Sequence, residues 1–281
     1  MNKKECISCY SSNLKVKCYK SDILIDSNEY KETYFNICLD CGLHFRDINY
    51  DSKEIMKHFE LVQYNQNQYN SYYRKIRQNY FVFLKNNIIK IKKDDKKKFL
   101  LDVGPSYGHF IETFQKNINY KIDGVEINSD LRNKLKSKFN GDFYSNFEQV
   151  KNKSYDVVTM IDSFYYFENP RLLLSKIYLL LKSDGIVVIR ITNRQWIIRI
   201  LILFNLSVPE ALIGDQKTIF SIKSFKKLVL SEKFKIKKII NHEKGKNHDG
   251  ILRLLIYKIS ELLSYLNINI NPGLIFILEK K

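Results

Sequence analysis

Apolar positions follow two different patterns along the chain. Residues 72–92 carry apolar and aromatic side chains at helical spacing, which predicts a helix that leads into the main domain. Phe99 to Val103 follows as a continuous apolar run, which is typical of a strand buried on both faces of a parallel sheet. Ile122 to Ile127 and Ile186 to Ile191 predict two more strands of this kind. Strands separated by helical stretches predict an α/β protein.

The composition fits a folded protein of one large domain, or of one domain with an appendage. The 281 residues are 44% hydrophobic and include only 10 Gly and 4 Pro, which excludes a disordered or fibrous chain. The longest central apolar run, Trp196 to Leu206, is shorter than the roughly 20 residues that cross a bilayer, and Arg199 interrupts it. The first residues lack the apolar core of a signal peptide, so we expect a cytoplasmic protein without a transmembrane helix.

The charge balance suggests a polyanionic partner but does not require one. The chain has 47 Lys and Arg against 30 Asp and Glu, a net charge of +17, which is typical of proteins that bind nucleic acid or anionic membranes. Lys, Asn, Ile and Tyr are abundant together, as AT-rich coding would produce in any protein. The runs Lys92 to Lys98 and Lys235 to Lys238 are short and flank strands, so we expect solvated rims. Nucleic-acid binding is therefore not favoured.

Four of the five cysteines form two C-x2-C pairs, Cys6 with Cys9 and Cys38 with Cys41. Each pair places two thiolates on one tight turn, and two such turns complete a tetrahedral zinc site. The 28 residues between the pairs exceed the usual spacer, which predicts an inserted hairpin with Tyr30 to Ile37 as one strand. A rubredoxin-like iron site and unbound or redox-active cysteines are the alternatives.

A glycine loop follows the first buried strand. Asp102 lies at the end of this strand, and Gly104-Pro-Ser-Tyr-Gly108 leads into a helix predicted for His109 to Phe114. This arrangement brings the backbone close to a ligand. Glu126 ends the next strand, where a carboxylate can accept both hydroxyls of a ribose. Because Ser106 stands between the two glycines and a third glycine is missing, dinucleotide binding is disfavoured.

The sequence LLDVGPSYGHF resembles the first motif of class I S-adenosylmethionine-dependent methyltransferases, an acid followed by Gly-x-Gly-x-Gly. Ser106 replaces the middle glycine. Ser154 to Pro170 is similar to the fourth strand and following loop of that family, and Leu274 to Lys280 to its last, antiparallel strand. The resemblance implies a Rossmann-like seven-stranded sheet over residues 95–281. The further elements expected are a strand at Asp142 to Ser145, a helix at Arg171 to Lys182 ended by Ser183 to Gly185, a helix at Ser221 to Lys233 and a strand at Phe234 to Ile240.

The N-terminal part resembles the zinc-ribbon leader of a bacterial methyltransferase group. The second cysteine pair, in Cys-Leu-Asp-Cys-Gly-Leu-His-Phe, carries this similarity. We expect a zinc ribbon at residues 1–50, a helical leader or lid at 51–94 and the methyltransferase domain at 95–281. The resemblance implies S-adenosylmethionine and structural zinc as cofactors. It also implies methyl transfer to a hydroxyl or carbon of a sugar, nucleotide-sugar or related small metabolite.

The resemblance assigns a cofactor site by position. Asp102 is expected to orient the glycine loop and to reach the amino group of the cofactor, partly through water. Glu126 is expected to hold the ribose hydroxyls. Asn146 and Phe147 are expected to contact the adenine, with Asp142 as the alternative polar partner. The other residues assigned to the cofactor are Gly104, Ser106, Gly108, Ile127, Ile161 and Asp162.

The candidates for catalysis are less certain matches to the family pattern. Relatives commonly carry Glu-His in the loop after the fourth strand, where this chain has Tyr165 and Tyr166. Tyr166 is expected to hydrogen-bond an acceptor hydroxyl, and Asn193 matches a position near the acceptor pocket. His242 is a reserve candidate for the general base. The remaining candidates are Glu243 and His248 for the base and Tyr64, Tyr69, Tyr72 and Tyr73 for a lid.

Two other functions stay open at this point. An RNA methyltransferase agrees with the net charge of +17 and with a zinc ribbon. An inactive scaffold agrees with Ser106 and with the missing Glu-His pair. Trp196 to Pro209 and Gly250 to Asn271 are apolar enough to cap the acceptor site or to contact a membrane surface. Core packing or a dimer contact is the favoured role of both segments, and the sequence leaves the oligomeric state open.

Overall fold

A computed structural model describes most of the chain. The described residues are 4–22, 30–46, 66–93, 96–115, 119–151, 153–204, 206, 208, 210–213, 216–240, 255, 258–263, 266 and 270–281. Of residues 20–22, 30–32, 66–70, 72–73 and 210–211 only the backbone is described.

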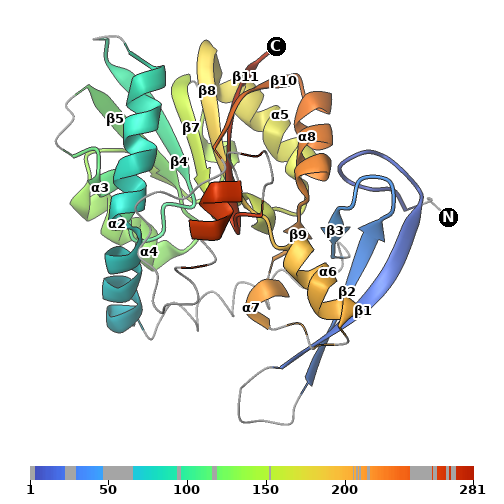
Figure 1. Cartoon of the computed structure of the whole chain (residues 1–281). Coiled ribbons are helices and arrows are strands. Elements are labelled where there is room, and N and C mark those ends of the chain that lie inside the picture. The colour runs from blue at the N-terminus through green and yellow to red at the C-terminus, as the bar shows by residue number, and fades with distance from the viewer. Residues whose placement is uncertain are drawn as a thin grey trace.

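A seven-stranded sheet forms the centre of the described structure (Figure 1). Its strand order is β10-β11-β8-β7-β4-β5-β6. β11 pairs antiparallel with β10 and β8, and the other neighbours pair in parallel. The strands are β4 (Lys98–Val103), β5 (Tyr120–Val125), β6 (Phe143–Tyr144), β7 (Tyr155–Ile161), β8 (Leu181–Thr192), β10 (Phe234–Ile240) and β11 (Gly273–Lys280). The predicted Rossmann-like sheet with an antiparallel last strand is therefore confirmed.

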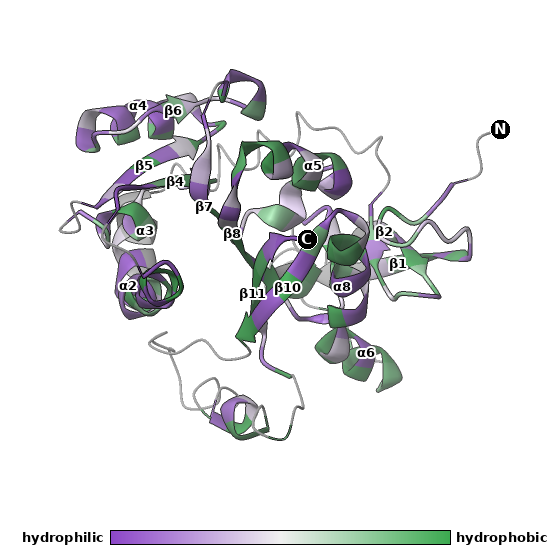
Figure 2. Cartoon of the chain, turned by 90° about the horizontal axis from the view of Figure 1, so that it is seen from above, coloured by the Kyte–Doolittle hydropathy of each residue, from purple (hydrophilic) through white to green (hydrophobic). Residues whose placement is uncertain are grey.

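Helices cover both faces of this sheet because successive strand residues point to opposite sides. Leu100 packs in the cluster on the face of α2, α3 and α4, whereas Leu101 packs in the cluster on the face of α5 and α8. Figure 2 shows α2 and α3 on one side and α5 on the other. The helices are α2 (Gln66–Ile91), α3 (His109–Glu112), α4 (Ser129–Lys138), α5 (Pro170–Leu180) and α8 (Ile222–Ser231).

A second sheet, of four strands, combines the N-terminal region with a distant segment. Its order is β1-β2-β3-β9, with β1 (Leu14–Asp22), β2 (Tyr30–Cys38), β3 (His44–Phe45) and β9 (Thr218–Ile219). β1 and β2 form the predicted inserted hairpin. Cys38, Leu43 and Phe45 share one buried cluster with Phe220 and Phe225 of the main domain. The N-terminal sheet and the central sheet are therefore built around one continuous core.

Local boundaries differ from the expectations where the strand pairing is irregular. Ser183 to Gly185, expected to end a helix, lies inside β8. Leu181 already pairs with Tyr155, and regular pairing resumes only at Ile186 with Val157, so the intervening residues form an irregularity within the strand. β5 ends one residue before Glu126, and β6 is confined to two residues. Hydrophobic pattern alone does not specify such register shifts.

Most of α6 (Gln195–Leu203) belongs to the segment from Trp196 to Pro209, and this helix lies beside the N-terminal sheet (Figure 1). Ile198 is fully buried in a cluster with Tyr19 and Phe35 of the hairpin, so one face of α6 packs in the core as favoured. Leu203 and Phe204 are exposed on the other face. Most of the segment Gly250 to Asn271 lies outside the described residues. Among the helices that are described, none combines the length and the apolarity that a bilayer crossing requires.

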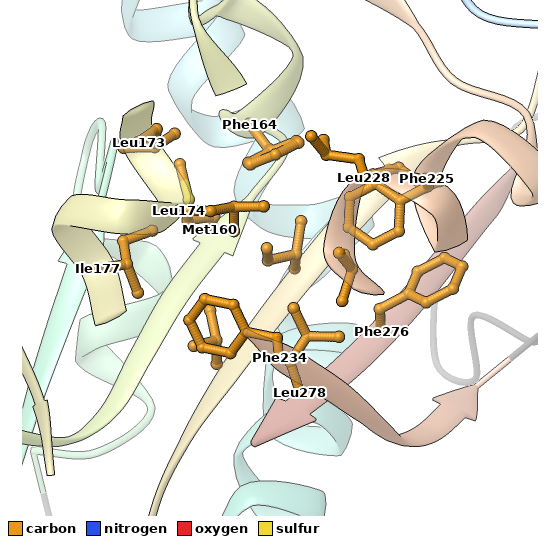
Figure 3. Packing of buried hydrophobic residues seen from close by; sticks show 14 of the residues in the cluster. Met160, Phe164, Leu173, Leu174, Ile177, Phe225, Leu228, Phe234, Phe276 and Leu278 are labelled. Carbon is orange, nitrogen blue, oxygen red and sulfur yellow. The ribbon is translucent and has the colours of Figure 1, made fainter. Parts of the chain in front are cut away.

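Replacing Phe225 by alanine tests the core on the α5 and α8 face (Figure 3). Phe225 is fully buried, and its ring centroid lies 5.5, 5.5 and 4.5 Å from those of Phe164, Phe220 and Phe276. We expect Phe225→Ala to lower the free energy of unfolding in urea by about 3 to 5 kcal/mol. Leu179→Ala, at a position 80% exposed, should change it by less than about 0.5 kcal/mol. Equal effects of the two variants would contradict this assignment.

Candidate functional site

A cavity of about 730 Å³ lies at the carboxyl ends of three central strands. Val103, Val125 and Ile161, the last residues of β4, β5 and β7, all line it. In open α/β sheets this edge is where ligands bind, because the loops that follow the strands leave a crevice between them. The volume lies within the range of about 300 to 1,000 Å³ that is usual for small-molecule sites.

The glycine loop after β4 adopts left-handed backbone conformations. Gly104 and Gly108 have φ angles of 78° and 76°, and Ser106 between them has a φ of 51°. A Cβ atom at Gly104 would lie 2.8 Å from the Cβ of Ser163, and one at Gly108 would lie 2.5 Å from Phe139. Only glycine fits at these two positions. Ser106 adopts the conformation that glycine would adopt there, so the loop keeps its shape despite the substitution.

Glu126 joins the loops that follow β4 and β5. Its Oε2 accepts a hydrogen bond from the Ser106 amide, and its Oε1 accepts one from the Asn128 amide, both at 3.0 Å. The side chain is buried and lines the cavity. Burial raises the pKa of this carboxyl, and the backbone amides of Asn128, Ser106 and Ile127 and the charge of Arg132 oppose that rise. An ionised carboxylate offers about four acceptor sites, so Glu126 keeps some acceptor capacity for donors in the cavity.

Asp102 lies beneath the loop and not in the wall of the main cavity. It lines an adjoining cavity of about 30 Å³, which is large enough for a water molecule. Thr159 Oγ1 donates a hydrogen bond to Asp102 Oδ1 at 2.6 Å. Burial raises the pKa of Asp102 to about 7, Thr159 opposes this rise, and the nearby charge of Glu126 adds to it.

Asn146, Phe147 and Ile127 line the end of the cavity next to β5 and β6. Asn146 caps the short helix η1 (Phe147–Gln149) by accepting a hydrogen bond from the Gln149 amide at 3.2 Å. Asp142, the alternative to Asn146, is exposed, pairs with Lys153 and does not belong to the cavity wall. The geometry therefore brings Asn146, and not Asp142, to the cavity.

Asp162 follows β7 and lines the cavity together with Ile161. It has a φ of 62°, and its carboxylate forms ion pairs with Arg77 of α2 and Arg190 of β8. Arg77 lines the cavity as well. Sequence reasoning missed both arginines, because the pairs join positions far apart in the chain and lie in no recognisable motif.

The expected catalytic residues do not all meet at the cavity. Tyr166, in the short helix η2 (Phe164–Tyr166), lines it. Asn193 is buried and does not line the cavity. Its side-chain Nδ2 donates to the Asn271 carbonyl at 3.1 Å, and its backbone amide donates to the Pro272 carbonyl at 2.8 Å. Other candidates cannot be compared with the cavity: His242, Glu243, His248 and Tyr64 lie outside the described residues, and of Tyr69, Tyr72 and Tyr73 only the backbone is described.

Two ion pairs at the cavity were also missed from the sequence. Lys217 pairs with Glu168, Lys176 pairs with Glu148, and all four residues line the cavity. Lys217 directly precedes the two-residue strand β9. A strand this short has no period-2 pattern, so no local signal could have indicated that Lys217 reaches the cavity.

The four cysteines of the two pairs form one cluster, with all Sγ atoms within 4.8 Å of one another. Cys6 and Cys41 are 3.6 Å apart, and Cys9 and Cys38 are 3.5 Å apart. Four thiolates about 2.3 Å from one zinc ion lie roughly 3.8 Å from one another, so the cluster fits a tetrahedral metal. The hydrogen bond between Cys6 and Cys41 lowers the pKa of Cys6 and raises the pKa of Cys41, because the two thiols share one proton. Since cysteine would fill every position, the metal would be structural.

His44 is not part of this cluster. It is buried, its ring stacks on that of Tyr19 at a centroid distance of 6.1 Å, and its Nδ1 lies 3.4 Å from the Tyr19 hydroxyl. Burial and the charges of Arg199 and Lys17 lower the pKa of His44 to about 4. His44 is therefore a neutral core residue.

Comparison with known proteins agrees with this fold. The family model described as a methyltransferase domain matches residues 72–236. No curated protein matches the sequence.

Three solved structures illustrate the similarity. The plantazolicin methyltransferase BpumL, in complex with a monoazolic desmethylPZN analog and SAH, is 20% identical, with a TM-score of 0.53 over 82% of this chain and 98% of that chain. The plantazolicin methyltransferase BamL is 17% identical, with a TM-score of 0.55 over 79% and 91% of the chains. A chain from the Haloferax volcanii complex that contains the Trm112 methyltransferase activator is 10% identical, with a TM-score of 0.55 over 75% and 94%. At these identities the likeness concerns the fold.

Gly104→Ala tests the left-handed loop. A φ of 78° and the contact with Ser163 both disfavour a side chain at this position, so we expect the free energy of unfolding to fall by about 1 to 3 kcal/mol. Ser106→Gly is the matched control, because glycine adopts the φ of 51° at that position without strain and should change stability by less than about 1 kcal/mol. Chemical denaturation of both variants provides the measurement. A Gly104→Ala protein as stable as the parent would show that the loop has another conformation.

Asp102→Asn tests the burial of that carboxyl. Its pKa of about 7 lies above the ordinary 3.8, so the folded protein binds the proton more tightly than the unfolded chain. The stability of the ligand-free protein must then fall as the pH rises from about 4 through 7. Asn cannot ionise, so it removes this fall in stability, and its side-chain oxygen can still accept the Thr159 hydroxyl. The variant should therefore melt at a higher temperature than the parent near pH 8, and the difference should be smaller near pH 5. A difference in melting temperature that does not change with pH would refute the raised pKa.

Proposed function

The chain belongs to the methyltransferase domain family, and we propose that it transfers a methyl group from S-adenosylmethionine to a hydroxyl or carbon of a sugar, nucleotide-sugar or related small metabolite. The observation that carries this proposal is that one cavity joins the glycine loop, the Glu126 carboxylate and a separate polar end. A cofactor and an acceptor can then lie end to end in it.

The cofactor end supports S-adenosylmethionine through its donors and acceptors. Glu126 accepts the ribose hydroxyls with the sites that the Ser106 and Asn128 amides leave. Gly104 and Ser106 would let the backbone approach the methionine part, and Asp102 would act on its ammonium group through a water that the small cavity is large enough to hold. Bound there, the cofactor supplies an activated methyl group on a sulfonium.

The reaction needs positioning more than it needs acid or base chemistry. Transfer from this cofactor would require the acceptor oxygen or carbon to lie in line with the methyl carbon and the sulfur, and the proton of the acceptor would pass to solvent. Holding the two reactants in line supplies much of the rate. Tyr166 would orient an acceptor hydroxyl. The ordinary pKa of a tyrosine is near 10, so a tyrosine is a weak base at neutral pH.

The acceptor end is polar and contains charges of both signs. Arg77, Glu168, Lys217 and Tyr166 line the cavity and are assigned to this end, since the cofactor would occupy the part beside Gly104 and Glu126. Several donors and acceptors in one compact wall suit a polyhydroxylated or phosphorylated small molecule. The plantazolicin methyltransferases have a peptide-derived acceptor by name, but at 17 to 20% identity they support only the shared fold.

The RNA alternative is less well supported by this cavity. An RNA site needs a continuous row of lysine and arginine side chains directed at phosphates. Lys176 and Lys217, which flank the cavity, form ion pairs with Glu148 and Glu168. The first argument for an inactive scaffold, Ser106, is weakened, because Ser106 adopts a left-handed φ of 51° that is accessible to glycine.

Calorimetric titration with S-adenosylmethionine tests the proposed cofactor. We expect binding by the metal-loaded protein and a loss of affinity of about tenfold or more in Glu126→Ala, which corresponds to about 1.4 kcal/mol. Asp130→Ala is the control, because Asp130 is an exposed carboxylate in the first turn of α4 and lies outside the cavity wall. A folded protein that does not bind the cofactor at millimolar concentration would overturn the proposal. Binding would justify a comparison of nucleotide sugars and RNA as acceptors, with formation of S-adenosylhomocysteine as the readout.

A further inference from the structure

The first cysteine turn, residues 6–9, is held by α5, a helix that borders the cavity. Arg171, in the first turn of α5, donates from Nε to the Ile7 carbonyl at 2.8 Å and from Nη2 to the Ser8 carbonyl at 2.7 Å. Its guanidinium also lies 3.7 Å from the centroid of the Tyr10 ring. Leu172, the next residue of α5, lines the cavity. One end of α5 therefore contacts the metal-binding turn on one side and the cavity on the other.

The second cysteine turn, residues 38–42, is held by two side chains of the main domain. Ser221 Oγ donates to the Cys41 carbonyl at 2.9 Å. Gln195 Nε2 donates both to the Gly42 carbonyl and to the Ile219 carbonyl, the latter at 2.7 Å. Since Ile219 belongs to β9, the Gln195 amide links this cysteine turn directly to that strand.

β9 continues into the cavity wall. β3 of the N-terminal sheet pairs with it, and the Arg46 amide donates to the Lys217 carbonyl at 2.9 Å. The Lys217 amide donates in turn to the Tyr165 carbonyl at 3.0 Å. Lys217 and Tyr165 both line the cavity. Backbone hydrogen bonds therefore connect the cysteine-bearing sheet to the acceptor end without interruption.

Glu168 lies just before α5, which contacts the first cysteine turn, and Lys217 lies just before β9, which is linked to the second. The ion pair between Glu168 and Lys217 joins these two segments. The Glu168 side chain is 46% exposed, and an exposed pair of this kind contributes only about 0 to 1 kcal/mol. The pair is therefore too weak to hold the wall in place by itself. The hydrogen bonds to both cysteine turns are partly buried, and the bond from Gln195 to Ile219 is buried, so water competes with them less than with the exposed ion pair.

We propose that the four-cysteine ribbon, in its metal-bound form, positions the acceptor wall of the cavity, namely Tyr165, Glu168 and Lys217. Arg171 and Gln195 are the positioning residues that connect the ribbon to this wall. The proposal rests on the proposed function, since it assigns the acceptor to this end. The cofactor end is built on β4 and β5, so disturbing the ribbon contacts should loosen the acceptor wall selectively.

Hydrogen exchange of backbone amides, measured by mass spectrometry on the metal-loaded protein, tests this proposal. Gln195→Met keeps a similar volume but removes the donor to Gly42 and Ile219. We expect the peptides that contain residues 164–169 and 216–220 to exchange about tenfold faster or more, since local opening governs their exchange. Peptides that contain residues 100–108 and 122–128 should exchange at the parent rate, and the metal content should be unchanged.

Arg171→Met is the second variant, and it should accelerate exchange in residues 164–176 for the same reason. Lys15→Met, at an exposed position on β1, is the matched control and should leave every peptide at the parent rate. Faster exchange confined to residues 4–46, or equal acceleration at both ends of the cavity, would overturn the proposal. Titration of the same variants with S-adenosylmethionine separates the two claims, because absent cofactor binding by the parent contradicts the proposed function whatever the exchange pattern.

Discussion

The hydrogen bond from the Ser106 amide to the Glu126 carboxylate is the contact on which the site depends. It connects the loop after β4 to the loop after β5, and the cavity lies where these loops separate. To present its amide, residue 106 adopts a φ of 51° between two glycines that are also left-handed. The strands on either side are buried and well paired, so they can hold this unfavourable conformation in place.

Three carboxylates lie at the carboxyl ends of β4, β5 and β7, and the fold stabilises each of them differently. Glu126 receives backbone amides, Asp162 receives two guanidinium groups, and Asp102 receives one hydroxyl and has a raised pKa. A buried carboxylate is costly unless it is paired or protonated. Asp102 is therefore the least compensated of the three in the ligand-free protein, and a cationic ligand nearby would favour its ionised form.

The ribbon is part of the same folded unit as the methyltransferase domain. Its hairpin contributes Phe35 to a cluster with Ile198 of α6, and its cysteine turns contribute to the cluster that contains Phe225. β9 completes the ribbon sheet from the opposite half of the sequence. A metal bound by the four cysteines would stabilise two tight turns whose carbonyl groups accept hydrogen bonds from the main domain.

The sequence by itself determined the features that depend on local pattern. These are the buried strands such as Lys98–Val103, the glycine loop with Glu126 after the next strand, and two cysteine pairs whose spacing suits one metal. Tertiary structure alone decided which distant residues meet. Arg77 and Arg190 reach Asp162, and Lys217 reaches Glu168, because helices and strands far apart in the chain pack at one edge of the sheet. An ion pair between such positions has no periodicity or spacing in the sequence, so it becomes visible only once the strand order and register are known.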